Sequence, residues 1–254
     1  FRSVYIRGNG VETTGNTKQY EFGDPFNLNL HRTLFNSVLR NGSSVPVSLS
    51  HEDFEVNHAE HLTQSATVLL LDQSKSMGMF GSWESAKKVA LALYSLISSQ
   101  FPRDHFSMVG FSDYGMEINP KDLPETTWNN WVSGTNMQHG LMLARRLLSR
   151  QKVASKQVIM ITDGEPTAHL EDGQAYFSYP SSYRTIEETL KEVKRCTLEG
   201  VTINTFMLES NDYLMDFVDK MTRINKGRAF YTTSAQLGRY VMVDYLRNRR
   251  YRGV

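Results

Sequence analysis

Oxygen-bearing side chains gather where apolar, strand-like runs of this sequence end. The stretch LLLDQSKSMG stops its apolar run at Asp72, and Ser74 and Ser76 follow at alternate positions. A second apolar run, KQVIMITD, ends at Asp163, and a glycine-bearing loop between the two runs carries Thr135. Carboxylates and hydroxyls without sulfur or imidazole suit a hard cation such as Mg²⁺. We expect the serine hydroxyls to bind the ion directly and the aspartates to hold water around it.

The elements that must position these side chains alternate along the chain from residue 67 onward. Short apolar runs predict strands, and apolar residues at helical spacing predict the helices between them. The predicted strands are 67–72, 105–112, 116–119, 156–163, 201–208 and 228–233, and the predicted helices are 82–101, 136–150, 185–199, 212–225 and 235–250. This alternation predicts a doubly wound α/β domain, with a mostly parallel sheet and helices on both faces. Ligands of such sheets bind at the carboxyl ends of the strands, so the oxygen-bearing side chains should converge there.

Residues 1–65 do not continue the alternation. The segment 24–42 predicts a helix that is opened by Asp24 and Pro25 and closed at Gly42, and residues 46–58 predict extended structure. We therefore expect an N-terminal extension over residues 1–65, packed on the edge of the sheet, followed by the α/β domain over residues 66–254.

The composition excludes several classes of function. The chain has 254 residues with 28 basic and 27 acidic side chains, so no net field favours nucleic acid or a membrane surface as a partner. No apolar run approaches the roughly 18 residues that a membrane crossing requires. A single cysteine, Cys196, excludes an intramolecular disulfide framework and favours a reducing, cytoplasmic location. The first residue is Phe1, so we expect the sequence to be a piece of a longer protein.

The same residues resemble a known family. The D-x-S-x-S pattern from Asp72 to Ser76, followed by Gly134-Thr135 and by Thr162-Asp163-Gly164, is similar to the metal-ion-dependent adhesion site of von Willebrand factor type A domains. The resemblance covers about residues 66–250. It implies an integrin I-domain-like fold without catalytic activity. It also implies one Mg²⁺ or Mn²⁺ ion with an open position that a partner's Asp or Glu carboxylate fills. The residues implied as metal ligands are Asp72, Ser74, Ser76, Thr135 and Asp163.

Within that family, the chain looks most like bacterial cytoplasmic members. These include CoxE-like proteins and the D subunits of magnesium chelatase. The resemblance implies a MoxR-type or chelatase-type AAA+ ATPase as the partner, in complex assembly or in metal insertion.

A long segment follows the second aspartate, and its sequence shows neither helical nor alternating spacing. It includes GEPTAHLEDGQAYFSYPSSYR, which carries Glu165, Tyr176 and Phe177. Long loops in compact domains are often functional, and aromatic residues are enriched at interface anchors. We therefore predict that these three residues belong to a partner-binding rim around the ion, although the aromatic rings could instead fasten the loop to its own domain.

Two other functions stay open from the sequence. A metal-assisted hydrolase would use the same ion to activate water. It would need a general base close to the ion, and only Glu165 or His169 could serve as that base. Alternatively, the domain is purely structural, and its Ser and Asp residues are ordinary caps at strand-to-helix turns.

Overall fold

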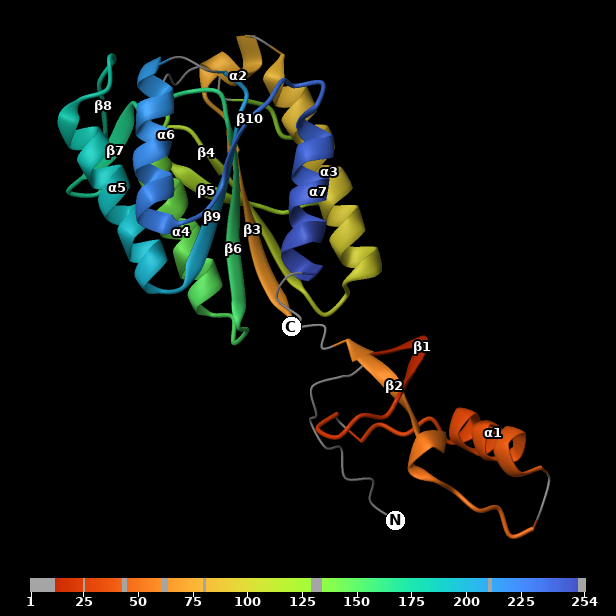
Figure 1. The fold of residues 1–254 in the computed structure, drawn as a ribbon. Helices are drawn as coiled ribbons and strands as arrows, with labels where there is room; N and C mark the ends of the chain where they lie inside the picture. The colour runs from red at the N-terminus through yellow and green to blue at the C-terminus, as the bar shows by residue number, and fades with distance from the viewer. Residues whose placement is uncertain are drawn as a thin grey trace, which may run out of the picture. The chain divides into compact units, whose positions relative to one another are not determined.

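The computed structural model describes residues 12–24, 26–42, 45–60, 64–79, 81–128, 134–209 and 212–250. The chain divides into two compact units (Figure 1). The first comprises Phe1–Leu62 with Arg249–Val254, and the second comprises Thr63–Asn248. Each unit is described by itself below.

The second unit is built on a six-stranded sheet in the order β10-β9-β6-β3-β4-β5. All neighbouring pairs are parallel except β4 and β5, which are antiparallel. The chain leaves β3 toward β5 in one direction and then continues from β6 toward β10 in the other, so the topology switches between β3 and β6. The strands are β3 (Ser65–Asp72), β4 (His105–Phe111), β5 (Gly115–Ile118), β6 (Ser155–Thr162), β9 (Val201–Met207) and β10 (Ala229–Tyr231).

Helices cover both faces of this sheet (Figure 1). On one face, α4 (Met137–Ser149), α5 (Tyr183–Leu198) and α6 (Asp212–Asn225) pack over Val68 and Leu70 of β3. On the other face, α3 (Ser82–Gln100) and α7 (Leu237–Arg250) pack over Leu69 and Leu71.

Every residue of β3 is buried, because alternate side chains of a strand point to opposite faces and both faces are covered here. The prediction of a doubly wound, mostly parallel α/β fold is confirmed. None of the described helices has both the length and the apolar run that a membrane crossing requires.

The segment after β6 is more regular than its sequence suggested. It forms an antiparallel hairpin of β7 (Ala168–Glu171) and β8 (Gln174–Phe177). The turn consists of Asp172 and Gly173, with φ of 48° and 82°. An Asp-Gly pair with positive φ at both positions is typical of tight hairpins, so the prediction that this whole segment lacks regular structure was wrong.

The first unit pairs β1 (Glu12–Gln19) with β2 (Glu55–Glu60) in antiparallel fashion and adds the helix α1 (Leu30–Asn41). The helix begins later than predicted, because the Asn29 side chain caps it by accepting a hydrogen bond from the backbone N–H of Arg32. It ends before Gly42, as predicted. The extended segment was placed too early, since residues 51–53 form a short 3₁₀ helix and β2 begins at Glu55.

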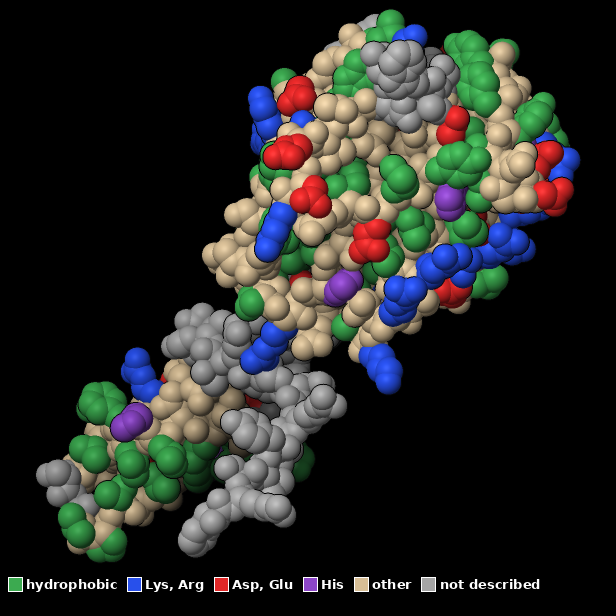
Figure 2. All heavy atoms as spheres, turned by 180° about the vertical axis from the view of Figure 1, so that it is seen from behind, with side chains coloured by type: hydrophobic (Ala, Val, Ile, Leu, Met, Phe, Trp, Pro, Cys, Tyr) green, Lys and Arg blue, Asp and Glu red, His purple; other side chains and the backbone are tan. Residues whose placement is uncertain are grey.

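The helix α1 turns its polar side inward. Thr33 and Ser37 are buried, and the Arg40 guanidinium lies 2.7 Å from the Asp53 carboxylate, which lowers the pKa of that carboxyl to about 2. The opposite side exposes apolar residues, and Figure 2 shows hydrophobic side chains gathered on this unit. The exposed apolar residues of the helix are Leu30, Leu34, Phe35, Val38 and Leu39. Hydrogen bonds therefore hold α1 to β2, and an ion pair holds it to the short 3₁₀ helix. The packing of this unit on the sheet edge stays a prediction.

The connection between α6 and β10 depends on a glycine. A Cβ atom at Gly227 would lie 1.8 Å from the carbonyl oxygen of Ile203 in β9, and a backbone atom cannot yield as a side chain can. We expect Gly227→Ala to lower the free energy of unfolding by about 2 kcal/mol, as overpacking of a close contact does. Denaturant unfolding measures the change.

The matched control is Gly238→Ala in α7, where a Cβ would make an ordinary 3.4 Å contact with Val89. Because alanine favours a helix over glycine, this variant should be as stable as the parent or up to about 1 kcal/mol more stable. Equal stability of the two variants would contradict the packing described for Gly227.

Candidate metal centre

Two aspartates meet at the switch point of the sheet. Asp72 is the last residue of β3, and Asp163 follows directly after β6, the hydrogen-bonded neighbour of β3. Both residues are buried, with 0% and 5% of their surface exposed. Among the residues that the structure describes, no lysine, arginine or histidine forms an ion pair with either carboxylate. Two groups of like charge therefore lie close together without a basic partner.

Hydrogen bonds join these aspartates to the predicted serines. The Asp72 carboxylate accepts from the backbone N–H of Ser74 at 2.8 Å and from the hydroxyl of Thr162 at 2.5 Å. The Ser76 hydroxyl donates to Asp163 Oδ1 at 2.8 Å and lies 3.1 Å from the Ser74 hydroxyl. Asp72 thus fixes the turn of Ser74, which leads from β3 into the short helix α2 (Lys75–Met79), and Ser76 in that helix reaches Asp163.

The fifth predicted residue, Thr135, comes from the loop before α4. Its backbone N–H donates to the Thr167 hydroxyl at 2.9 Å, and its carbonyl accepts from the Thr167 N–H at 3.1 Å. A Cβ atom on Gly164 would lie 4.0 Å from the Thr135 hydroxyl oxygen, so this hydroxyl faces the backbone next to Asp163. Hydrogen bonds thus link four of the five predicted residues, and the fifth, Thr135, lies next to Gly164, the residue that follows Asp163. Val132 and Ser133 of the same loop lie outside the described residues.

Electrostatics at the centre favour a cation. Burial raises the pKa of Asp163 to about 7, and the nearby charge of Asp72 and, to a lesser degree, of Glu209 adds to the effect. Burial also raises the pKa of Asp72, against the hydrogen bonds from Thr162 and Ser74. A positive charge between the two carboxylates would favour their ionised forms.

The donor atoms at the centre also fit a hard divalent ion. Asp163 Oδ2 is buried and has no hydrogen-bond partner in the described part of the chain. Only two of the five side chains are carboxylates, and no group of three or more His, Cys, Asp or Glu that could hold a metal occurs among the described residues. The remaining donors are hydroxyls, and such oxygen-only sets can bind Mg²⁺ or Mn²⁺ when water completes the shell.

The residues predicted to form a partner-binding rim lie in the segment that follows the centre. Tyr176 and Phe177 on β8 are 48% and 45% exposed. Glu165 is turned toward Ser181, and one of its carboxylate oxygens is buried without a hydrogen-bond partner, so burial raises the pKa of this carboxyl. No contact found among the described residues joins the two rings to the metal centre, and their role in binding stays a prediction.

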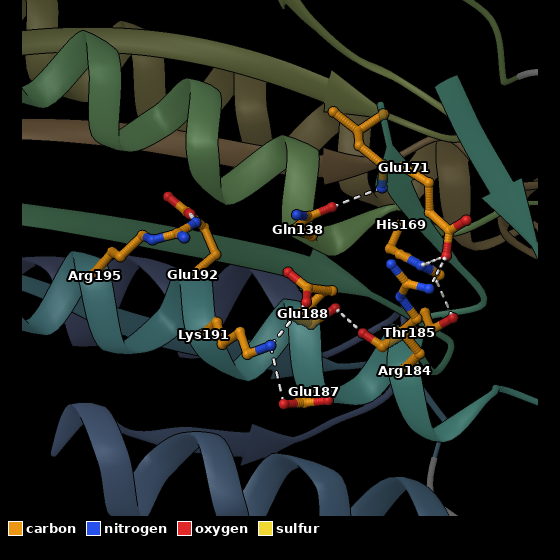
Figure 3. A network of polar contacts seen from close by, with 12 residues as sticks. Gln138, His169, Glu171, Arg184, Thr185, Glu187, Glu188, Lys191, Glu192 and Arg195 are labelled. Carbon is orange, nitrogen blue, oxygen red and sulfur yellow. Dashed lines mark hydrogen bonds and ion pairs between the residues drawn. The ribbon is translucent and has the colours of Figure 1, made fainter. Parts of the chain in front are cut away.

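A buried histidine fastens the hairpin to the domain (Figure 3). His169 Nδ1 lies 3.0 Å from the Thr185 hydroxyl, and Nε2 lies 3.0 Å from the Glu171 carboxylate. The Gln138 side chain of α4 accepts from the backbone N–H of Leu170 at 2.8 Å. Because His169 is fully buried and both of its ring nitrogens have partners, it is not available as a general base.

Two threonines outside the predicted ligand set position the centre. Thr162 holds the Asp72 carboxylate, and its place in the Thr162-Asp163-Gly164 pattern was a signal for it. Thr167 holds the loop of Thr135, and this contact spans 32 residues of sequence without any local signal.

Comparisons with known proteins agree with this architecture. The family model described as "Rv0959-like protein, vWA domain" matches residues 65–246, and the model "Rv0959-like protein, third domain" matches residues 12–59. The uncharacterized protein Rv0959 of Mycobacterium tuberculosis is 37% identical over 250 residues, which cover 96% of this chain and 37% of that protein. The uncharacterized protein Mb0984 of Mycobacterium bovis matches to the same extent. The chain thus spans 37% of the length of these relatives.

Solved structures with a similar fold have distant sequences. The PilB minor pilin from Streptococcus sanguinis gives a TM-score of 0.57 at 15% identity, over 74% of this chain and 62% of that one. The vWF domain of the type V pili tip protein Mfa5 from Porphyromonas gingivalis gives a TM-score of 0.53 at 13% identity, over 70% of this chain and 92% of that one. At such identities the likeness concerns the fold alone. The family match shows that the chain belongs to the Rv0959-like family and that residues 65–246 are its vWA domain.

Proposed function

We propose that this chain is a non-catalytic, divalent-cation-dependent protein-interaction module. Its residues Asp72, Ser74, Ser76, Thr135 and Asp163 hold one Mg²⁺ or Mn²⁺ ion, and an Asp or Glu of a partner protein completes the coordination. The main support for the proposal is that two buried aspartates lie at the ends of adjacent strands without a basic partner among the described residues. The unpaired oxygen of Asp163 supports it.

The physical reason for such a centre is charge compensation. The ion supplies the positive charge that the two carboxylates lack, and it retains positive charge toward the open side of the sheet edge. An incoming carboxylate replaces a water molecule and gains charge pairing where solvent is partly excluded. Thr162 and Thr167 act through the residues that they hold, since one fixes the Asp72 carboxylate and the other fixes the loop of Thr135.

The partner in this proposal is a AAA+ ATPase of the MoxR or chelatase type, in the cytoplasm. The support is the resemblance of the motif and its loops to CoxE-like proteins and to chelatase D subunits. The single cysteine supports the location. The module would join such an ATPase to a complex under assembly or to a site of metal insertion.

An enzyme is the second candidate, and one observation favours it. Burial raises the pKa of Glu165, and this carboxylate follows Asp163 by two residues, as a general base for metal-activated water would. Magnesium-dependent phosphatase or esterase activity that is absent from Glu165→Gln would support this alternative against the binding module.

The raised pKa of Asp163 leads to a pH-dependent effect of Mg²⁺. In the metal-free fold this carboxyl keeps its proton up to about pH 7, whereas its ordinary pKa is 3.8. Folded-state stability therefore falls as the pH rises between these values, because the unfolded chain has already lost the proton. Mg²⁺ binds the ionised form, so its stabilising effect should be small at pH 5.5 and larger at pH 8.

Thermal unfolding with Mg²⁺ or with EDTA measures this effect. At a concentration 100-fold above Kd we expect about 2.7 kcal/mol at pH 8, or roughly 5–10 °C in Tm. Asp163→Asn should remove the dependence of the Mg²⁺-induced stabilisation on pH. An equal Mg²⁺ shift at both pH values would contradict the assignment of the site.

The partner should bind only through the ion. We expect a complex between the chain and a MoxR-type or chelatase-type ATPase of the same organism to form in Mg²⁺ and to dissociate in EDTA. Ser74→Ala and Thr135→Ala should weaken it, while Ser99→Ala near the end of α3 should not. A pull-down with tagged protein tests this. A complex that survives EDTA, or none with any such ATPase, would count against the proposal.

The hairpin should contribute to partner binding without affecting the ion. Replacing both Tyr176 and Phe177 by alanine should weaken the complex by about 2 kcal/mol or more, in the range of interface hot spots. Mn²⁺ affinity should stay unchanged. Tyr240→Ala, at a ring of 40% exposure on α7, is the control. If the double variant loses thermal stability and still binds its partner normally, the two rings are structural.

A further inference from the structure

A hollow lies beside the candidate metal centre, at the carboxyl ends of β9 and β10. Its volume is about 300 Å³. The residues at the end of β9 form one wall, with Glu209 at the rim, and the segment that joins β10 to α7 forms the other. The side chains that line it include Glu209, Tyr231, Thr233 and Gln236.

The hydrogen bonds of the sheet place this hollow next to Asp163. The backbone N–H of Leu208 donates to the carbonyl of Thr162 at 3.0 Å, and Thr162 pairs with Met207 in the register of β6 and β9. Asp163 therefore comes one residue, and Glu209 two residues, after this pair on adjacent strands. Strands in a sheet lie about 4.8 Å apart. The hollow therefore begins about one strand spacing from Asp163 and extends about one spacing further.

The far wall of the hollow is tied to the elements that carry the metal centre. The Ser234 hydroxyl lies 3.2 Å from the hydroxyl of Ser82, the first residue of α3, and α3 follows the turn of Ser74 and Ser76. The backbone N–H of Thr232 donates to the carbonyl of Met207 at 2.9 Å, which fixes the loop to β9. The hollow and the centre therefore keep a fixed spacing within one unit.

The lining of the hollow accepts hydrogen bonds and carries negative charge. Glu209 is exposed, and no lysine, arginine or histidine is among the lining residues. Thr233 and Gln236 add oxygen acceptors, and Tyr231 offers an aromatic surface that is 39% exposed.

Charged residues of the neighbouring elements surround the hollow. The neighbouring elements bring the acids Asp72, Asp163, Glu165 and Asp219. Their basic residues include Lys75 on α2, Lys220 and Arg223 on α6, and Arg239 on α7, and Lys220 and Arg223 each pair with an aspartate of their own helix. Once an ion offsets the charge of the two aspartates, Glu209 remains as the carboxylate that faces the hollow.

We propose that this hollow takes a lysine or arginine side chain from the same partner segment whose carboxylate completes the metal centre. The inference rests on the proposed function. The aliphatic stem of the side chain lies against Tyr231, and its charged head pairs with Glu209 and donates to Thr233 and Gln236. An extended peptide rises about 3.3 Å per residue, and the two sites are about 5–10 Å apart, so one to three residues separate the acid from the base.

Selection from a random peptide library tests this recognition. Phage-displayed heptapeptides are bound to the immobilised chain in Mg²⁺ and released with EDTA. The released pool should be enriched in an Asp or Glu with a Lys or Arg within three positions. Glu209→Gln should keep the acid and lose the basic preference, and Glu117→Gln on β5 should keep both. An enriched peptide should bind Glu209→Gln about fivefold more weakly, as loss of an ion pair worth about 1 kcal/mol implies.

The outcomes separate the two proposals. If EDTA releases no enriched peptides, the metal-dependent function fails and takes this inference with it. If the pool is enriched in acids without a nearby base, or if Glu209→Gln keeps the basic preference, the metal-dependent function stands and the role of the hollow is overturned.

Discussion

The repulsion between Asp72 and Asp163 is the constraint on which the rest of the site depends. Burying a carboxylate without a positive partner costs free energy, and here two of them share the end of adjacent strands. Hydrogen bonds from Thr162, Ser74 and Ser76 reduce this cost, yet they leave Asp163 Oδ2 unpaired. In our proposal, a divalent cation offsets the part of this free-energy cost that the hydrogen bonds leave. Partner binding depends on the ion for the same reason.

The fold explains why these groups meet. The strand order reverses between β3 and β6, so the loops that follow these strands diverge to opposite faces and leave a crevice at their carboxyl ends. Three separate loops supply the five side chains, and each is fixed by a hydrogen bond to another. The hairpin of β7 and β8 follows β6 along the chain, and the hollow lies at the ends of β9 and β10. In our proposal, the partner segment that binds the ion reaches both the hairpin and the hollow.

The sequence predicted the sheet, and it predicted which strand ends carry oxygen-bearing side chains, because both signals are local. An apolar run as long as β3 is buried on both faces only in a parallel sheet covered by helices, and the oxygen-bearing residues stand directly at strand ends. The hairpin escaped prediction because its strands are short and largely exposed, although Asp172-Gly173 marked the turn. The orientation of α1 could not be read from its pattern, since spacing reveals which face is apolar but not which face is covered. The role of Thr167 depends on its contact with Thr135, and the two residues lie 32 positions apart in the sequence, so a short stretch of sequence does not contain both.

Calorimetric titration with Mn²⁺ tests the central claim most directly. The account predicts that one ion binds per chain and that Asp72→Ala and Asp163→Ala each abolish binding, while Asp216→Ala on the exposed surface of α6 leaves it unchanged. Circular dichroism of the same samples verifies that both variants fold, since their side chains stand at strand ends rather than within the apolar core. Unchanged Mn²⁺ affinity in both folded variants would contradict the assignment of the metal centre.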